Sequence, residues 1–353
     1  MIETPRAPRL PAPRGPLSEC VRTALATGPP GGTDRLRPYP AGTDDPWGGD
    51  LQLALYVCYE LHYRGFEGVD PDWEWDPELL RLRRGLERHF LAAVREETGE
   101  PPPLDELLDR LLTEPRTGTG PSHFLLARGE RWQAREYLVH RSLYHLKEAD
   151  PQLWAAPRLG GAAQAAFLSV EYDEYGAGHP DRAHSRLFAE MMADFGLDPA
   201  YGRYVDAAAA PALAVVDLMS LFGLHRALRG ALVGQFAAVE ITSSPGSARL
   251  ARAFERLGAG PAGTRFYEEH VEADAVHEQL VRHGVIAPLL ASEPGLAGDV
   301  AFGIAASSLA EDRLAAHLTA SWAAGHSSLR GGPLTGGAPP DGSPRGGPLT
   351  GSG

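Results

Sequence analysis

Apolar residues recur at helical spacing through almost the whole middle of this chain, and this periodicity most restricts the folds open to it. Breaks in the pattern fall at Gly/Pro clusters such as 176–180, 243–246 and 258–261. No convincing run of alternating apolar and polar residues indicates strands, so the sequence predicts an all-α fold. The expected helices cover residues 50–63, 77–97, 104–112, 131–146, 161–175, 180–194, 207–228, 230–242, 246–257, 264–283 and 296–324.

The two ends of the chain differ from this helical middle. The first 48 residues are rich in proline and glycine and indicate irregular structure, with one short helix expected near 18–27. From about residue 331 the hexapeptide Gly-Gly-Pro-Leu-Thr-Gly occurs twice, and such a composition buries too little apolar surface to offset its ordering entropy. We therefore expect four parts: a Pro/Gly-rich segment (1–48), a helical extension (49–116), a main helical domain (117–328) and a disordered tail (329–353).

Bulk composition argues against several classes of protein. A net charge of −13 disfavours a nucleic-acid partner, because such binding depends on neutralising phosphates with Lys and Arg. The two cysteines, Cys20 and Cys58, are too few for a disulfide framework or a thiolate metal site. No apolar run approaches the roughly 20 residues that span a bilayer, and the Pro- and Arg-rich start lacks an apolar secretion core. We therefore expect a cytoplasmic protein with no membrane partner.

His270, Asp274 and His277 lie on one stripe of the helix expected over residues 264–283. At about 100° per residue, Asp274 and His277 point within roughly 40° of His270. Two imidazoles and a carboxylate that converge in this way suit a divalent transition metal such as iron, manganese or zinc. A solvated helix face is the alternative, because four glutamates surround the stripe: Glu268, Glu269, Glu272 and Glu278.

A helical bundle builds metal sites from side chains that project inward from facing helices, so other segments should supply further ligands. Glu174 and His184 flank a Gly/Pro break, and bending of the chain there could bring them together across ten residues. Glu240 is an isolated carboxylate in an apolar run, where its desolvation would be costly unless it is paired or bound to a metal. Glu148, at a helix end, is the fourth candidate, although it would serve equally as a simple helix-end residue.

Other polar residues compete with these candidates. Glu171 lies one turn before the first carboxylate, and His179 is expected in the turn that follows. Asp181 is expected at a helix N-terminus, where it would complement the helix dipole. Glu136 and His140 have metal-binding spacing on one helix, but we favour a supporting or surface role for both.

The order of these residues resembles a known pattern: a Glu, a His about ten residues later, a second Glu roughly sixty residues on, and then a helix with His-x3-Asp-x2-His. Over about residues 50–326 the chain is similar to the haem-oxygenase-like diiron oxidases and oxygenases, in particular the actinobacterial iron-containing redox enzymes. Its segments Lys147-Glu-Ala-Asp-Pro151 and Asp173-Glu-Tyr-Gly176 also look similar. The resemblance implies these metal ligands: Glu174, His184, Glu240, His270, Asp274 and His277.

Members of the N-oxygenase type add a mobile carboxylate upstream of the first Glu, and Glu148 falls at that position. The resemblance thus makes Glu148 the candidate catalytic carboxylate. The paired Glu-x-x-His of ferritin-like bundles is absent from the sequence, which favours the haem-oxygenase-like arrangement. We expect a seven-helix bundle of this type within residues 117–328, with the helical extension packed beside it.

The resemblance also implies the chemistry. Two non-haem iron ions per chain would use O2 as co-substrate to oxidise a small organic substrate in secondary metabolism, such as an amine, an amino acid or a fatty acid. We expect an external electron donor and a homodimer as partners. A non-catalytic iron-binding or storage protein of the same fold is the alternative. Haem binding is disfavoured, because a haem needs one axial His and the clustered carboxylates would remain buried and unpaired.

Overall fold

The computed structural model describes residues 7–31, 36, 44–113 and 118–334, with every side chain in these ranges except those of residues 272, 274 and 275. These residues form thirteen α-helices and no β-strand, so the prediction of an all-α fold is confirmed. From residue 335 onward the predicted C-terminal tail lies outside the described ranges.

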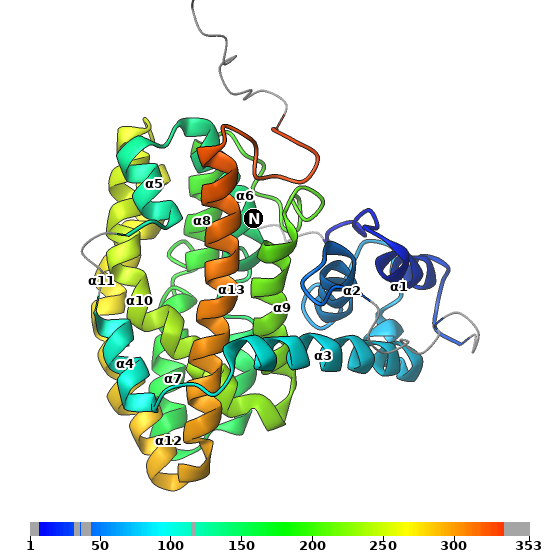
Figure 1. Cartoon of the computed structure of the whole chain (residues 1–353), viewed down its shortest axis with the longest axis horizontal. Coiled ribbons are helices and arrows are strands. Elements are labelled where there is room, and N and C mark those ends of the chain that lie inside the picture. The colour runs from blue at the N-terminus through cyan, green and yellow to red at the C-terminus, as the bar shows by residue number, and fades with distance from the viewer. Residues whose placement is uncertain (1–6, 32–35, 37–43, 114–117, 335–353) are drawn as a thin grey trace, which may run out of the picture.

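The helices of the main body pack side by side, and a smaller N-terminal group lies beside them with α3 across their long axes (Figure 1). The N-terminal group is α1 (Pro16–Ala26), α2 (Gly49–Glu60) and α3 (Pro77–Thr98). The helices that follow are α4 (Leu104–Leu112), α5 (Pro121–Arg128), α6 (Arg131–His145), α7 (Gly161–Glu174), α8 (His184–Asp194), α9 (Ala210–Leu224), α10 (Arg229–Arg256), α11 (Pro261–Gln279), α12 (Ala287–Ser292) and α13 (Ala297–Ala323). Among the described residues no single helix is long and apolar enough to cross a membrane, although two bent helix pairs reach that length and composition together.

The expected helix break at residues 243–246 is wrong. α10 continues from Arg229 to Arg256 with Pro245 in its interior. Proline removes the hydrogen bond to the carbonyl of Ile241 and costs about 3 kcal/mol in a helix interior. Packing of α10 against both α11 and α13 offsets this cost, because it buries apolar residues on both sides of the proline. Glu240 therefore lies within a continuous helix, one turn before the proline.

Two other segments also differ from expectation. The helix expected from residue 180 begins at His184, so Asp181 lies in the preceding turn and not at the helix N-terminus. Gly176 and Gly178, both with φ of +85°, reverse the chain in this turn, and this reversal brings the start of α8 back to the end of α7. The helix expected over residues 264–283 instead ends at Gln279 and continues as a π-helix over Leu280–Ile286, a form common near functional sites.

α10 and α13 cross in backbone contact through two glycines. A Cβ atom on Gly234 of α10 would lie 2.0 Å from the carbonyl oxygen of Val300. Equally, a Cβ atom on Gly303 of α13 would lie 2.0 Å from the carbonyl oxygen of Ala231. Because backbone atoms cannot rotate away as side chains can, only glycine fits at either position. The crossing fixes the position of the α10 segment that carries Glu240.

We expect Gly303→Ala to destabilise the protein by about 3 kcal/mol or more, because the added methyl group must push two helices apart. Gly298→Ala on the same helix is the matched control, since its Cβ atom would meet nothing within 4 Å. The control should be neutral or stabilising by up to about 1 kcal/mol, from the better helix propensity of alanine. Urea unfolding of the two variants measures both effects, and equal stabilities would contradict the close crossing.

Glu136 and His140 on α6 hold the end of α13 and the residues that follow it, so the surface role considered from the sequence is wrong. Both side chains are buried, with 2% of each residue exposed. Glu136 accepts hydrogen bonds from the Trp322 indole, from the hydroxyl of Ser327, and from the hydroxyl and the N–H of Ser328. His140 Nε2 donates to the Ser328 hydroxyl at 3.2 Å, and its Nδ1 accepts from a backbone N–H at 3.4 Å. These contacts fix the chain against the main body as far as Arg330, whose N–H donates to the Ala207 carbonyl.

Burial, with help from the nearby His317, lowers the pKa of His140 from 6.5 to about 3. Below pH 6.5 the unfolded chain therefore binds a proton at His140 that the folded chain does not bind. The free energy of unfolding consequently falls as the pH is lowered. Between about pH 6.5 and pH 5.5 this loss amounts to about 1 kcal/mol. We expect His140→Gln to remove that part of the pH dependence, measured as the free energy of unfolding at both pH values. An unchanged slope would show that His140 titrates normally in the folded protein.

Candidate metal centre

Four helices and one turn bring the candidate ligands into the interior of the main body, where all that are described are buried. They are Glu148 from the turn after α6, Glu174 from the end of α7, His184 from the start of α8, Glu240 from α10, and His270 and His277 from α11. The stripe of α11 that carries His270 and His277 thus faces the interior. The alternative of a solvated stripe does not fit these two side chains.

The ligand atoms form two groups that share one carboxylate. Glu148, Glu174, His184 and His270 each place a ligand atom within 4.8 Å of the others, and we call this set the first cluster. Glu174, Glu240 and His277 do the same and form the second cluster. Glu174 belongs to both, so one carboxylate can serve two neighbouring cations.

The first cluster brings buried polar atoms within ligand distance of one another. His184 Nδ1 lies 2.7 Å from Glu174 Oε2, and Glu148 Oε2 is buried without a hydrogen-bond partner. His270 Nδ1 donates to the carbonyl of Phe266 at 2.7 Å, which leaves Nε2 as the nitrogen with a lone pair, 3.8 Å from Glu148 Oε1. Buried polar atoms are normally satisfied, so this set fits a bound cation as the common partner.

The second cluster is centred on His277. Its Nδ1 lies 3.0 Å from Glu240 Oε2 and 3.7 Å from Glu174 Oε1. Its Nε2 lies 3.4 Å from Asp173 Oδ2, a carboxylate of which the side chain is 47% exposed. Asp274 lies on α11 three residues before His277, but its side chain is outside the described set, so its role as a ligand stays a prediction.

The buried carboxylates draw positive charge toward themselves. Burial raises the pKa of Glu148, but the nearby His145 and His270 lower it more, so the net pKa falls well below its usual range. Burial lowers the pKa of His184, but Glu174 raises it more, and the net pKa lies above 6.5. Both shifts show that a positive charge is favoured among these groups, and a divalent cation would supply it.

His145 is a functional candidate that the sequence analysis missed. It is the last residue of α6, and its Nδ1 lies 2.9 Å from Glu148 Oε1. The rings of Tyr144, Phe188 and Phe266 enclose the imidazole, and burial lowers its pKa. A neutral His145 therefore donates to Glu148 from inside an aromatic cage. The i,i+3 spacing of the two residues at a helix end was the available sequence signal.

Glu171, the competing carboxylate on α7, belongs to neither cluster. It is 2% exposed, and neither of its carboxylate oxygens has a hydrogen-bond partner. Burial, followed by the charges of Glu174 and Glu240, raises its pKa well above its ordinary value. Glu171 is therefore held in the neutral form, unlike a metal ligand, which must be ionised.

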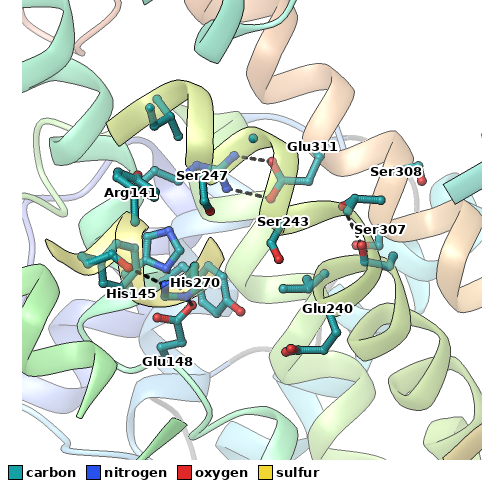
Figure 2. A pocket seen from close by; sticks show the side chains of 18 of the residues that line it. Arg141, His145, Glu148, Glu240, Ser243, Ser247, His270, Ser307, Ser308 and Glu311 are labelled. Carbon is teal, nitrogen blue, oxygen red and sulfur yellow. Dashed lines mark hydrogen bonds and ion pairs between the residues drawn. The ribbon is translucent and has the colours of Figure 1, made fainter. Parts of the chain in front are cut away.

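A cavity of about 360 Å³ adjoins the clusters (Figure 2). Glu148, Glu240 and His270 lie on one side of it, and Arg141 and Glu311 face each other on the other. The Arg141 guanidinium donates to both Glu311 oxygens, at 2.7 and 2.6 Å, so α6 and α13 are joined across the cavity wall. Hydroxyl groups also line the space, from Thr242, Ser243, Ser247, Ser307 and Ser308.

A family model described as iron-containing redox enzyme matches residues 135–312, which is just over half of the chain. The chain belongs to this family of iron-containing redox enzymes. The resemblance seen in the sequence is thus confirmed, and the matched segment contains every candidate ligand. A buried set of His and Glu side chains agrees with iron binding, and a member of this family is an oxidoreductase.

The chain is also similar to nitrosourea synthase of Streptomyces achromogenes subsp. streptozoticus. The two sequences are 27% identical over 232 residues, which is 64% of this chain and 49% of the relative. This chain therefore spans about half the length of the curated relative that it matches.

We expect Mn(II) to stabilise the protein against urea, by about 2.7 kcal/mol per bound ion at a concentration 100-fold above Kd. Glu174→Ala should abolish most of this effect, because it removes the one carboxylate that the two clusters share. Glu171→Gln is the matched control, a buried glutamate one turn earlier that belongs to neither cluster, and should keep the full effect. Stabilisation of Glu174→Ala equal to that of the parent protein would contradict the two-cluster arrangement.

Proposed function

We propose that this chain is an O2-dependent non-haem diiron oxidase or oxygenase. The observation that carries the proposal is the sharing of Glu174 between two ligand clusters, because a carboxylate can bridge two metal ions. Nitrogen and oxygen ligands of this kind suit iron in either of its common oxidation states. Membership of a family of iron-containing redox enzymes supports the same reading.

In this proposal Glu148, Glu174, His184 and His270 would hold one iron, and Glu174, Glu240, Asp274 and His277 would hold the other. Bound iron would supply the redox chemistry with O2, and an external donor would supply electrons. The protein side chains bind and orient. The hydrogen bond from His270 to the Phe266 carbonyl fixes one imidazole, and the rings of Phe188 and Phe266 help to keep water from the first cluster.

Glu148 is the candidate for a carboxylate that changes partner during the reaction. One of its oxygens lies 2.9 Å from His145 Nδ1, and the other has no hydrogen-bond partner. The carboxylate can therefore keep its hydrogen bond to His145 while its second oxygen would serve as a ligand to a bound cation. His145 holds its proton at Nδ1 in this arrangement, because burial keeps the imidazole neutral.

The cavity beside the clusters supports a small organic substrate. Its far wall offers a guanidinium and a carboxylate, in Arg141 and Glu311, together with several hydroxyl groups. Arg141 and Glu311 already pair with each other, and a polar, charged wall of this kind suits an amine or an amino acid better than the apolar chain of a fatty acid. The name of the nitrosourea synthase relative refers to a nitrogen-containing compound and agrees with a role in secondary metabolism.

Anaerobic loading with Fe(II) should give two iron ions per chain, and exposure to O2 with amines and amino acids should consume O2 and substrate together. Glu240→Ala should retain about one iron and lose substrate oxidation, because only the second cluster is damaged. Metal analysis, an oxygen electrode and mass spectrometry of the products measure these results. Glu171→Gln should behave as the parent protein.

Two results would contradict the proposal. Uptake of iron and O2 without any altered organic compound would favour an iron-storage role for the same fold. Failure to bind iron at the expected stoichiometry would exclude the diiron class.

A further inference from the structure

The turn that carries Glu148 is held from outside the metal centre. α6 ends at His145, and residues 146–150 form a turn before the next helical segment. Glu148 leaves this turn toward the first cluster. The preceding residue, Lys147, points toward α2, which lies in the helical extension expected over residues 49–116, called the N-terminal extension from here on. Its ammonium lies 3.1 Å from Glu60 Oε2. Two neighbouring side chains thus connect the metal centre to the extension.

The Lys147–Glu60 pair is almost completely buried, with 1% and 0% of the two side chains exposed. Tyr201 donates a hydrogen bond to the second oxygen of Glu60 at 2.7 Å. The rings of Tyr63 and Tyr56 lie 4.4 and 5.2 Å from the ammonium. Burying an ion pair gains little net stability, because desolvation of both charges offsets their attraction. A pair in this position is better explained by the geometry that it imposes on the turn.

The other residues of the turn are fixed as well. Arg64, just beyond α2, donates to the Leu146 carbonyl at 3.3 Å, and Tyr175 donates to Asp150 at 2.7 Å. Ala149 has a φ of +76°, a left-handed conformation that a residue with a Cβ adopts only when its surroundings impose it. The residue after Glu148 is therefore strained. The contacts of Leu146 and Lys147 on one side of it and of Asp150 on the other hold it in this conformation.

We propose that Lys147 is a positioning residue and that the N-terminal extension, acting through Glu60, sets the place of Glu148 in the metal centre. This inference rests on the proposed function to the extent that the first cluster binds a metal ion. Glu60 lies before residue 135, outside the segment that the family model matches. The residue that pairs with Lys147 therefore belongs to a part of this chain that the family model does not cover. The described residues of the extension contribute no candidate ligand, yet in this proposal they set the position of one.

The test uses Co(II) as a spectroscopic probe, titrated into the full-length protein under anaerobic conditions. The parent protein should show two binding events. In Lys147→Met and in Glu60→Gln, one event should weaken at least tenfold while the other is unchanged. The visible spectrum of the weakened site should match that of Glu148→Gln, because all three variants remove the same ligand from the same ion. A general loss of stability would not produce that spectral match.

Two further variants keep the test decisive. Lys147→Met combined with Glu60→Gln leaves no unpaired buried charge, so it should fold even where a single variant does not, and it should show the same weakened event. Glu87→Gln is the matched control. Glu87 is another buried glutamate of the extension, 3.1 Å from Arg83 and 3.0 Å from His225, and it does not contact the turn. Its Co(II) titration should equal that of the parent protein.

A folded double variant with the parent titration and spectrum would overturn the inference and leave the proposed function intact. Equal weakening in Glu87→Gln would also overturn it, since any damage to the extension would then suffice. A parent protein without two binding events would instead overturn the proposed function, and this inference with it.

Discussion

Repulsion among three buried carboxylates is the constraint on which this site depends. Glu148, Glu174 and Glu240 are each at most 7% exposed and meet inside one helical body. Charges cannot remain in such an interior without compensation. The neighbouring imidazoles supply part of the compensating positive charge, and Glu174 accordingly raises the pKa of His184. Cations held by the same atoms would supply the rest of this charge, so a metal centre explains the arrangement better than a network of hydrogen bonds.

Much of the fold and the ligand set follows from sequence because the signals are local. Spacings of four and three residues put His270 and His277 on one face of a helix whatever surrounds it. The glycines between Glu174 and His184 marked the bend that joins them. Apolar flanks marked Glu240 as a buried acid. Each of these inferences needed only a short stretch of chain.

Features that depend on tertiary packing were not predictable in this way. Pro245 signals a helix end, and only the packing of α10 between α11 and α13 overrides that signal. The aromatic cage around His145 is built by residues from several helices. Pairing of Lys147 with Glu60 joins residues 87 positions apart, and nothing near either residue indicates the other. For Glu136 the sequence favours a supporting or surface role, and it does not indicate the actual partners, which lie almost 200 residues later in the chain.

The glycine crossing of α10 and α13 limits how the neighbouring chamber could be reshaped. Both helices supply part of its lining, and because their backbones already touch, neither can move closer to the other to make room for a larger ligand. Extra room must come from trimming side chains on the facing elements, such as Tyr137 of α6 or Leu111 of α4. To admit larger molecules, the side chains of α4 and α6 would have to be shortened, while the wall formed by α10 and α13 keeps its shape.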